Sequence, residues 1–118
     1  MKPRVTVIDY GLGNLFSIQK AFEHCGAEVE LAKSTQSIIE ADRLVLPGVG
    51  AFAEGMKGLK NLGLIEPIKE FVSLGKPFLG ICLGMQMLMS ESEEFGRHQG
   101  LNIFPGTVSP VPRTSSDG

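Results

Sequence analysis

The chain has 118 residues, of which 42% are hydrophobic and 20% charged, and its formal net charge is −2. This length suffices for one domain that buries its own core without disulfides or a metal. The small negative charge gives no reason to expect nucleic acid or an anionic membrane as a partner. The two cysteines, Cys25 and Cys82, form no disulfide framework, so a reducing compartment is the simpler expectation. No signal peptide or transmembrane stretch is recognisable, and we expect a cytoplasmic location.

A β-branched run at residues 5–8 predicts a buried first strand. A loop with two glycines follows it, Tyr10-Gly11-Leu12-Gly13-Asn14. Ligands bind at such carboxyl ends of strands in open α/β sheets. A dinucleotide site is disfavoured, because Phe16 stands where the G-x-G-x-x-G pattern needs its third glycine.

The first helix is predicted from Asn14 onward and ends at Gly26. Its apolar positions recur at helical spacing: Ile18, Ala21, Phe22 and Cys25. This spacing turns Cys25 toward the core, where free cysteine is mostly inert. His24 lies on the opposite side of the helix, and we expect it to be solvated.

Two further strands are predicted at residues 27–31 and 43–46, with a short helix at 34–40 that Ser34 or Thr35 caps. After them, apolar positions at helical spacing predict two more helices. The first carries Phe52, Met56 and Leu59 and ends near Gly63, and the second carries Leu64, Ile65, Ile68, Phe71 and Val72 and ends at Gly75. We interpret these methionines and phenylalanines as core residues.

The third strand runs into Pro47-Gly48-Val49-Gly50. Two glycines beside a proline at a strand end bring backbone amides near the surface in unusual conformations. This loop is either an ordinary turn between a strand and a helix or a source of an N–H donor for an oxyanion. The local pattern favours neither.

Residues 76–89, KPFLGICLGMQMLM, contain Gly80-Ile81-Cys82-Leu83-Gly84 and predict a nucleophile elbow. In this turn a buried strand reverses sharply into a helix, and both flanking residues must be small. A thiol at Cys82 would sit at the positive end of the helix dipole, which favours the thiolate. The N–H of Leu83 would point at an oxyanion. The alternative is an inert cysteine in tight helix–strand packing.

Beyond the elbow the helix is predicted to continue, with Met85, Leu88 and Met89 facing inward. Gln86 lies one step off that stripe and either meets a ligand or lies on an ordinary surface. Residues 90–94 are expected to form a solvated helix end and 96–98 a loop. An apolar turn at 100–106, an extended segment at 107–112 and a polar tail at 113–118 complete the chain.

The pattern β-α-β-α-β-α-α-β-α predicts an α/β fold, a doubly wound and mostly parallel sheet with helices on both faces. Residues 1–118 are expected to form a single domain that is incomplete at its C-terminus. The last elements of such a sheet are absent from the pattern, so we also expect an uncovered sheet edge and exposed apolar surface.

Four blocks carry a resemblance to a known family: DYGLGNL at 9–15, LPGVGAF at 46–52, LGICLGMQ at 79–86 and GLNIFPG at 100–106. In order and spacing they resemble the glutaminase subunits of imidazole glycerol phosphate synthase, which are class I, triad-type glutamine amidotransferases of histidine biosynthesis. The resemblance implies that Cys82 attacks glutamine, giving a thioester and ammonia, and that water then releases glutamate. No metal or organic cofactor is implied.

The resemblance also implies roles for individual residues. The oxyanion hole would comprise Leu83, Val49 and Gly50, after a rearrangement of the loop. The glutamine-binding positions would be Gly48, Gly50 and Gln86. The loop with Tyr10, Gly11, Gly13 and Asn14 would face the partner. That partner is a (β/α)8-barrel cyclase subunit, which forms a heterodimer with the glutaminase and receives ammonia through an internal passage. There ammonia cleaves an aminoimidazole-carboxamide ribonucleotide, yielding imidazole glycerol phosphate.

The sequence departs from this family at the catalytic base, a histidine in an H-x-E pair near the C-terminus. The two histidines, His24 and His98, both lack a glutamate two residues later. We therefore expect the N-terminal portion of a glutaminase subunit, with nucleophile and oxyanion loop, that alone hydrolyses glutamine very poorly. Two alternatives stay open: a non-catalytic module that docks on the cyclase, and an unrelated elbow hydrolase or thiol sensor.

Overall fold

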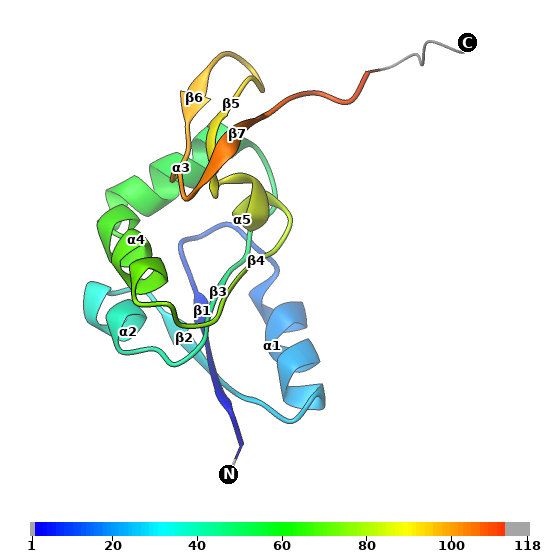
Figure 1. Cartoon of the computed structure of the whole chain (residues 1–118). Helices are drawn as coiled ribbons and strands as arrows, with labels where there is room; N and C mark the ends of the chain where they lie inside the picture. Colours follow the sequence, from blue (N-terminus) through cyan, green and yellow to red (C-terminus); the bar gives the residue numbers. More distant parts are fainter. Residues whose placement is uncertain (1, 113–118) are drawn as a thin grey trace.

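The computed structural model describes residues 2–112, which form five helices and two sheets (Figure 1). The elements are, in chain order, β1 (Arg4–Ile8), α1 (Leu15–His24), β2 (Glu28–Ala32), α2 (Thr35–Ile39), β3 (Leu44–Leu46), α3 (Phe52–Asn61), α4 (Ile65–Ser73), β4 (Phe78–Gly80), α5 (Leu83–Gln86), β5 (Met89–Ser92), β6 (His98–Gln99) and β7 (Phe104–Val108). No helix in this part of the chain is long and apolar enough to cross a membrane. The polar tail predicted at 113–118 lies outside the described residues.

The main sheet is parallel and has the strand order β2-β1-β3-β4. From β1 the chain moves first to β2 on one side and then to β3 and β4 on the other. The order therefore reverses between β1 and β3, and the carboxyl ends of these two strands meet at the point where α/β sheets of this kind bind ligands. The predicted doubly wound, mostly parallel sheet is confirmed.

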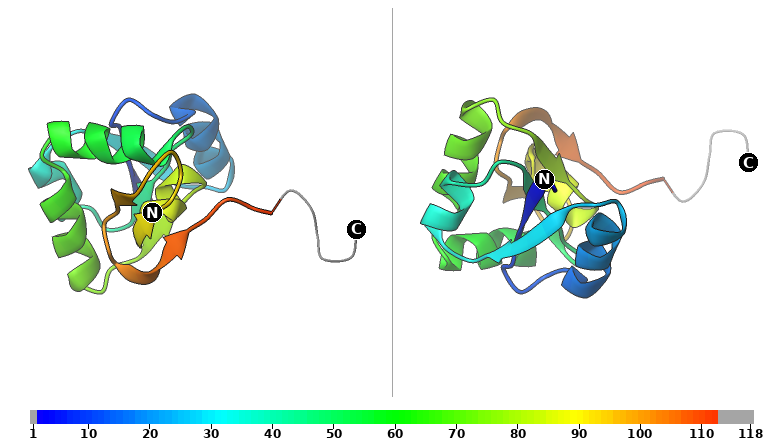
Figure 2. Two further views of the ribbon diagram at one scale, coloured as in Figure 1. Left: turned by 90° about the horizontal axis from the view of Figure 1, so that it is seen from above. Right: turned by 90° about the horizontal axis from the view of Figure 1, so that it is seen from below.

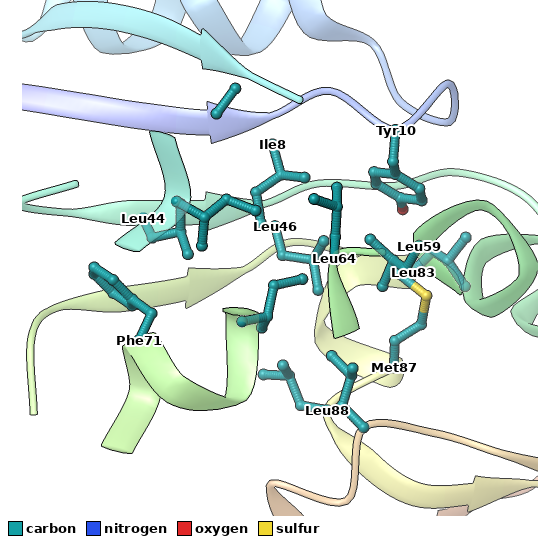
Figure 3. Close-up of a cluster of buried hydrophobic side chains, with 14 of the residues drawn as sticks. Ile8, Tyr10, Leu44, Leu46, Leu59, Leu64, Phe71, Leu83, Met87 and Leu88 are labelled. Atoms are coloured by element: carbon teal, nitrogen blue, oxygen red, sulfur yellow. The ribbon is translucent and has the colours of Figure 1, made fainter. Parts of the chain in front are cut away.

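Helices cover both faces of this sheet, as Figure 2 shows from two sides. On one face, α1 packs on a small cluster formed by Val5, Val7, Ala27 and Val45. On the other face, α2, α3, α4 and α5 enclose the larger core, part of which is drawn in Figure 3. Burying a leucine or phenylalanine side chain stabilises the fold by about 1.5–3 kcal/mol. The larger cluster, which includes Ile8 and Leu46, therefore stabilises the carboxyl ends of β1 and β3.

The predicted cap of α2 and the predicted end of α1 are confirmed. The Asn14 side chain accepts a hydrogen bond from the Ser17 N–H and caps α1, and the Ser34 side chain accepts one from the Ser37 N–H and caps α2. Gly26 follows α1 with φ +93, a conformation that suits glycine at the end of a helix. The second strand lies one residue later than predicted, at Glu28–Ala32.

The predicted continuation of the helix after Cys82 is wrong. The helix α5 ends at Gln86, and Met89–Ser92, part of which was assigned to a solvated helix end, forms strand β5. This strand is the centre of a second sheet, antiparallel to β6 and parallel to β7. Pairing with β7, a partner distant in sequence, overrides the helical spacing of the local pattern. Met85, expected to face inward, is 46% exposed.

Two predictions of burial also need correction. Cys25 is exposed, because it is the cap residue after the last turn of α1 and not part of the packed face. The strand β4 is half-exposed where burial was predicted, since it forms the edge of the main sheet and Leu79 is 50% exposed. The expectation of an uncovered edge with apolar surface is confirmed at this strand.

Candidate functional site

Cys82 lies in a sharp turn between β4 and α5, at the carboxyl end of the main sheet. Its backbone has φ 54 and ψ −118, a conformation that residues with a side chain rarely adopt. The thiol is free and exposed. The strand–turn–helix geometry expected of an elbow is therefore present, and its strain is of the kind found at functional sites.

The glycines on both sides of Cys82 are required by close backbone approaches. A Cβ at Gly80 would lie 2.8 Å from the Cα of Met85, and a Cβ at Gly84 would collide with the carbonyl oxygen of Leu46. The backbones of β3, β4 and α5 therefore pass one another at contact distance. Any side chain at these two positions would push the cysteine out of the turn.

The loop after β3, Pro47-Gly48-Val49-Gly50, lies directly against the elbow. Pro47 and Gly48 are buried, whereas Val49 and Gly50 are exposed. The N–H of Leu83 donates a hydrogen bond to the Gly48 carbonyl oxygen at 3.2 Å. The N–H expected to stabilise an oxyanion is therefore already bonded in this structure. A rotation of the peptide between Gly48 and Val49 would release it and turn the Val49 N–H toward the same place.

Tyr10 is placed differently from its predicted role at a partner surface. Its side chain is 6% exposed and points into the core (Figure 3), where its hydroxyl donates a hydrogen bond to the Pro47 carbonyl oxygen at 2.6 Å. Burial raises the pKa of Tyr10 above its usual range, because the charged phenolate would lose its water. In the rest of the predicted partner loop, Gly11 and Asn14 are exposed and Gly13 is partly buried.

Gln86 lies one helical turn after Cys82, and its N–H donates to the Cys82 carbonyl oxygen at 3.1 Å. Its side chain borders a cavity of about 420 Å³ between α5 and the start of the C-terminal segment. The other residues that line this cavity are Glu94, Phe95, Val108, Ser109, Pro110 and Val111. The cavity is large enough for an amino-acid side chain and its polar groups.

Glu94 is a residue of this site that the sequence interpretation missed, because it belongs to an acidic run assigned to solvent. Its carboxylate accepts a hydrogen bond from the Phe52 N–H, at the start of α3, at 3.2 Å. The residue before Phe52 is Ala51, whose side chain cannot cap a helix. An uncapped helix start was the signal in the sequence that an acceptor had to come from elsewhere.

The helix dipole contributes less at Cys82 than the sequence suggested. The helix α5 has four residues, so its aligned peptide dipoles are few. The N–H of Gly84 also donates to the Ile81 carbonyl oxygen at 2.9 Å.

The two histidines lie away from the elbow. His24 ends α1, near the amino ends of the strands of the main sheet. Cys82 follows β4, at the carboxyl ends of these strands. His98 lies on β6 in the second sheet, where its Nε2 is 3.1 Å from the Phe95 carbonyl oxygen. Within residues 2–112 no group of three or more His, Cys, Asp or Glu side chains is placed to hold a metal ion.

Comparison with protein families gives a match over most of the chain. The model of the family described as "Glutamine amidotransferase class-I" matches residues 6–114. Among solved structures, one titled "Crystal structure of glutamine amidotransferase" aligns with a TM-score of 0.75 at 20% identity and covers 89% of this chain and 55% of that one. A putative peptidase E protein from Listeria monocytogenes aligns with a TM-score of 0.69, also at 20% identity, over 86% of this chain and 63% of that one. These two structures support the fold.

Curated relatives are more similar in sequence. The chain is 57% identical over 114 residues to "Imidazole glycerol phosphate synthase subunit HisH 1" of Legionella pneumophila (strain Paris), which covers 97% of this chain and 54% of the relative. It is 54% identical over 108 residues to the HisH subunit of Syntrophotalea carbinolica, covering 92% of this chain and 52% of that protein. For the HisH subunit of Geobacter sulfurreducens the identity is 47%, with 98% and 55% covered. The chain thus spans about half the length of these relatives.

Proposed function

The chain belongs to the class-I glutamine amidotransferase family. On this premise we propose that it binds glutamine beside Cys82 and supplies the nucleophile of a glutaminase together with its oxyanion loop, residues 47–50. The observation that carries the proposal is the strained elbow itself. Cys82 has a positive φ, its thiol is exposed, and the loop after β3 lies against the next residue. An ordinary buried cysteine needs none of these features.

In the proposed reaction the thiolate of Cys82 attacks the side-chain amide carbon of glutamine. A C–S bond forms, and the carbonyl oxygen takes the negative charge in a tetrahedral intermediate. The intermediate collapses when the C–N bond breaks and the nitrogen, having accepted a proton, leaves as ammonia. Water then attacks the thioester, breaks the C–S bond and releases glutamate with the thiol restored.

The oxyanion would be stabilised by two backbone N–H groups. One is the N–H of Leu83, which is bonded to Gly48 in the present structure. We propose that glutamine binding rotates the peptide between Gly48 and Val49, which frees this N–H and adds that of Val49, with Gly50 as the flexible neighbour. Losing one such donor typically raises a barrier by roughly 3–4 kcal/mol.

Substrate recognition would use the cavity beside α5. Gln86 borders it with an amide, and Glu94 adds a carboxylate that is partly buried and available to the α-ammonium group of glutamine. The backbone of Gly48 and Gly50 would complete the site on the side of the oxyanion loop. Charge-assisted hydrogen bonds of this kind are among the stronger ones in proteins.

We propose that neither His24 nor His98 serves as the general base for this reaction. Neither His24 nor His98 lies at the elbow. The 118 residues alone should therefore hydrolyse glutamine very slowly. Release of glutamate that depends on Cys82 and is stimulated by the cyclase, at roughly 1 per second or more, would contradict this part of the proposal.

We further propose that the ammonia passes to a (β/α)8-barrel cyclase subunit that makes imidazole glycerol phosphate in the cytoplasm. The support is the identity to HisH subunits of synthases, of 57% in the Legionella protein. The exposed parts of the loop that docks would be Gly11 and Asn14. A non-catalytic docking module is the second candidate: it predicts that Cys82→Ala leaves binding to the cyclase intact and that no thioester forms in the unmodified chain.

The experiment compares two reagents at Cys82. The chloroketone analogue of L-glutamine carries a ketone that needs the oxyanion donors, whereas iodoacetamide reacts by direct displacement and needs none. We expect the analogue to modify Cys82 much faster than iodoacetamide does, with Cys25 as an internal control that shows no such preference. Equal preference at the two cysteines would indicate an unrelated thiol and contradict the proposal.

A further inference from the structure

The hydroxyl of Tyr10 and the N–H of Leu83 hold two consecutive carbonyl groups of the oxyanion loop. Tyr10 donates to the Pro47 carbonyl oxygen at 2.6 Å, and Leu83 donates to the Gly48 carbonyl oxygen at 3.2 Å. The bond from Tyr10 is buried, and its donor belongs to the loop that follows β1. The donor of the second bond, Leu83, belongs to the elbow after β4. The loop is therefore fixed from two different strand ends.

We propose that Tyr10 is a positioning residue for the oxyanion hole. Its hydroxyl anchors the Pro47–Gly48 peptide, so that the loop can rearrange only at the next peptide, between Gly48 and Val49. The inference rests on the proposed function and deepens it. Tyr10 touches no reacting atom in this scheme and acts through the loop.

The two hydrogen bonds have different roles when the loop rearranges. The bond from Leu83 to Gly48 must break if the Leu83 N–H is to serve an oxyanion. The bond from Tyr10 to Pro47 can remain, because it involves the preceding peptide. With that peptide fixed, the Val49 N–H turns toward Cys82 in a defined position; without the anchor, the whole loop from Pro47 onward would shift relative to Cys82.

The surroundings of Tyr10 are shaped to keep the hydroxyl on this loop. A Cβ at Gly48 would collide with the Tyr10 hydroxyl oxygen, and a Cβ at Gly58, on α3, would lie 3.2 Å from the Tyr10 ring. Glycine at both positions lets the ring pass between α3 and the loop. A Cβ at Gly13, in the loop after Tyr10, would lie 3.5 Å from the Pro47 ring, which is ordinary van der Waals contact.

The test uses Tyr10→Phe in the whole chain and measures the rate of Cys82 modification by the chloroketone analogue of L-glutamine and by iodoacetamide. We expect the ratio of the two rate constants to fall about tenfold, as for loss of one buried hydrogen bond, while the iodoacetamide rate stays unchanged. The matched control is Ser73→Ala, which removes a hydroxyl bond of the same 2.6 Å length, to the Glu70 carbonyl oxygen on α4. This control should leave the ratio unchanged.

Replacing Tyr10 by 4-aminophenylalanine restores a donor and should restore the ratio. An unchanged ratio in Tyr10→Phe would overturn this inference alone, provided that the unmodified chain prefers the glutamine analogue. A parallel fall in both rates, with a lower unfolding midpoint, would overturn it in favour of a purely structural role. If the unmodified chain shows no preference for the analogue, the proposed function itself fails, and this inference fails with it.

Discussion

The carbonyl oxygen of Gly48 accepts a hydrogen bond from the Leu83 N–H at 3.2 Å. This contact closes the loop after β3 onto the first residue of α5, directly beside the proposed nucleophile. The structure therefore holds the proposed oxyanion donor in a hydrogen bond that would have to break before this N–H could bind an oxyanion. A closed site would limit reaction until substrate or partner opens the loop. Opening breaks one backbone hydrogen bond, which costs about 0.5–1.5 kcal/mol.

Opening of this loop should be visible by NMR. We expect the amide proton signals of Leu83 and Val49 to shift when Cys82 reacts with the chloroketone analogue of glutamine, because the Leu83 N–H changes its acceptor and the Val49 N–H changes direction. After reaction with iodoacetamide the Val49 signal should stay close to its original position. Equal shifts with both reagents would mean that alkylation, and not an oxyanion, perturbs the loop.

The backbone strain at Cys82 should be measurable as lost stability. Its φ of 54 is unfavourable for a residue with a side chain, at a cost of about 1–3 kcal/mol. Cys82→Gly should therefore raise the free energy of unfolding by about 1 kcal/mol, after the entropy cost of glycine is subtracted, and abolish reaction with the glutamine analogue. Cys25→Gly is the control: with φ −82 it relieves no strain and should lower stability. Denaturant unfolding of both variants gives the comparison, and a loss of stability in Cys82→Gly would contradict the strain.

Tyr10 should make the stability of the chain fall at high pH. Burial raises its pKa above the usual 10.0, so above that pH the folded chain keeps a proton that the unfolded chain loses. The free energy of unfolding then decreases as the pH rises through the folded pKa. Because the chain has one tyrosine, its ionisation can be followed by ultraviolet absorbance. Tyr10→Phe should flatten the fall in stability, and a native titration midpoint at the usual value would contradict the burial.

Glu94 should select substrates that carry an α-ammonium group. Glu94→Gln keeps an oxygen for the Phe52 N–H but removes the charge. We expect it to slow modification of Cys82 by the chloroketone analogue about tenfold or more, since hydrogen bonds to charged groups contribute about 1.5–3 kcal/mol. Glu66 gives a control, because it is exposed on α4, away from the cavity beside α5, and Glu66→Gln should have little effect. If Glu94→Gln slowed modification of Cys82 equally for an analogue that lacks the α-amino group, Glu94 would not bind the ammonium group.

The parallel sheet and the elbow could be predicted from the sequence because both are encoded locally. Buried strands such as β1 are β-branched runs. The residues around Cys82 are glycines because the backbone contacts of such a turn leave no room for a side chain. Strand β5 could not be predicted in this way, since its partner β7 lies more than ten residues later and the spacing of Met85, Leu88 and Met89 is helical.

The candidate site could be predicted in part for the same reason. The proposed nucleophile and the Gly48 loop have recognisable local sequence patterns, whereas Tyr10 and Glu94 acquire their positions through contacts with Pro47 and Phe52. Each of these contacts joins residues more than thirty positions apart, and no local spacing specifies it. The exposure of Cys25 was missed because a cap residue keeps the spacing of the helix without sharing its packed face.

The most direct test of the account is whether L-glutamine protects Cys82. The chain is treated with iodoacetamide, and modification of Cys82 and Cys25 is followed by mass spectrometry with and without L-glutamine, using L-asparagine as the shorter control. Both thiols are exposed, so each reports on the same solution. We expect glutamine to slow modification of Cys82 and to leave Cys25 unaffected, and asparagine to slow modification of neither cysteine. Modification of Cys82 at the same rate with and without glutamine would contradict the claim that a glutamine site surrounds it.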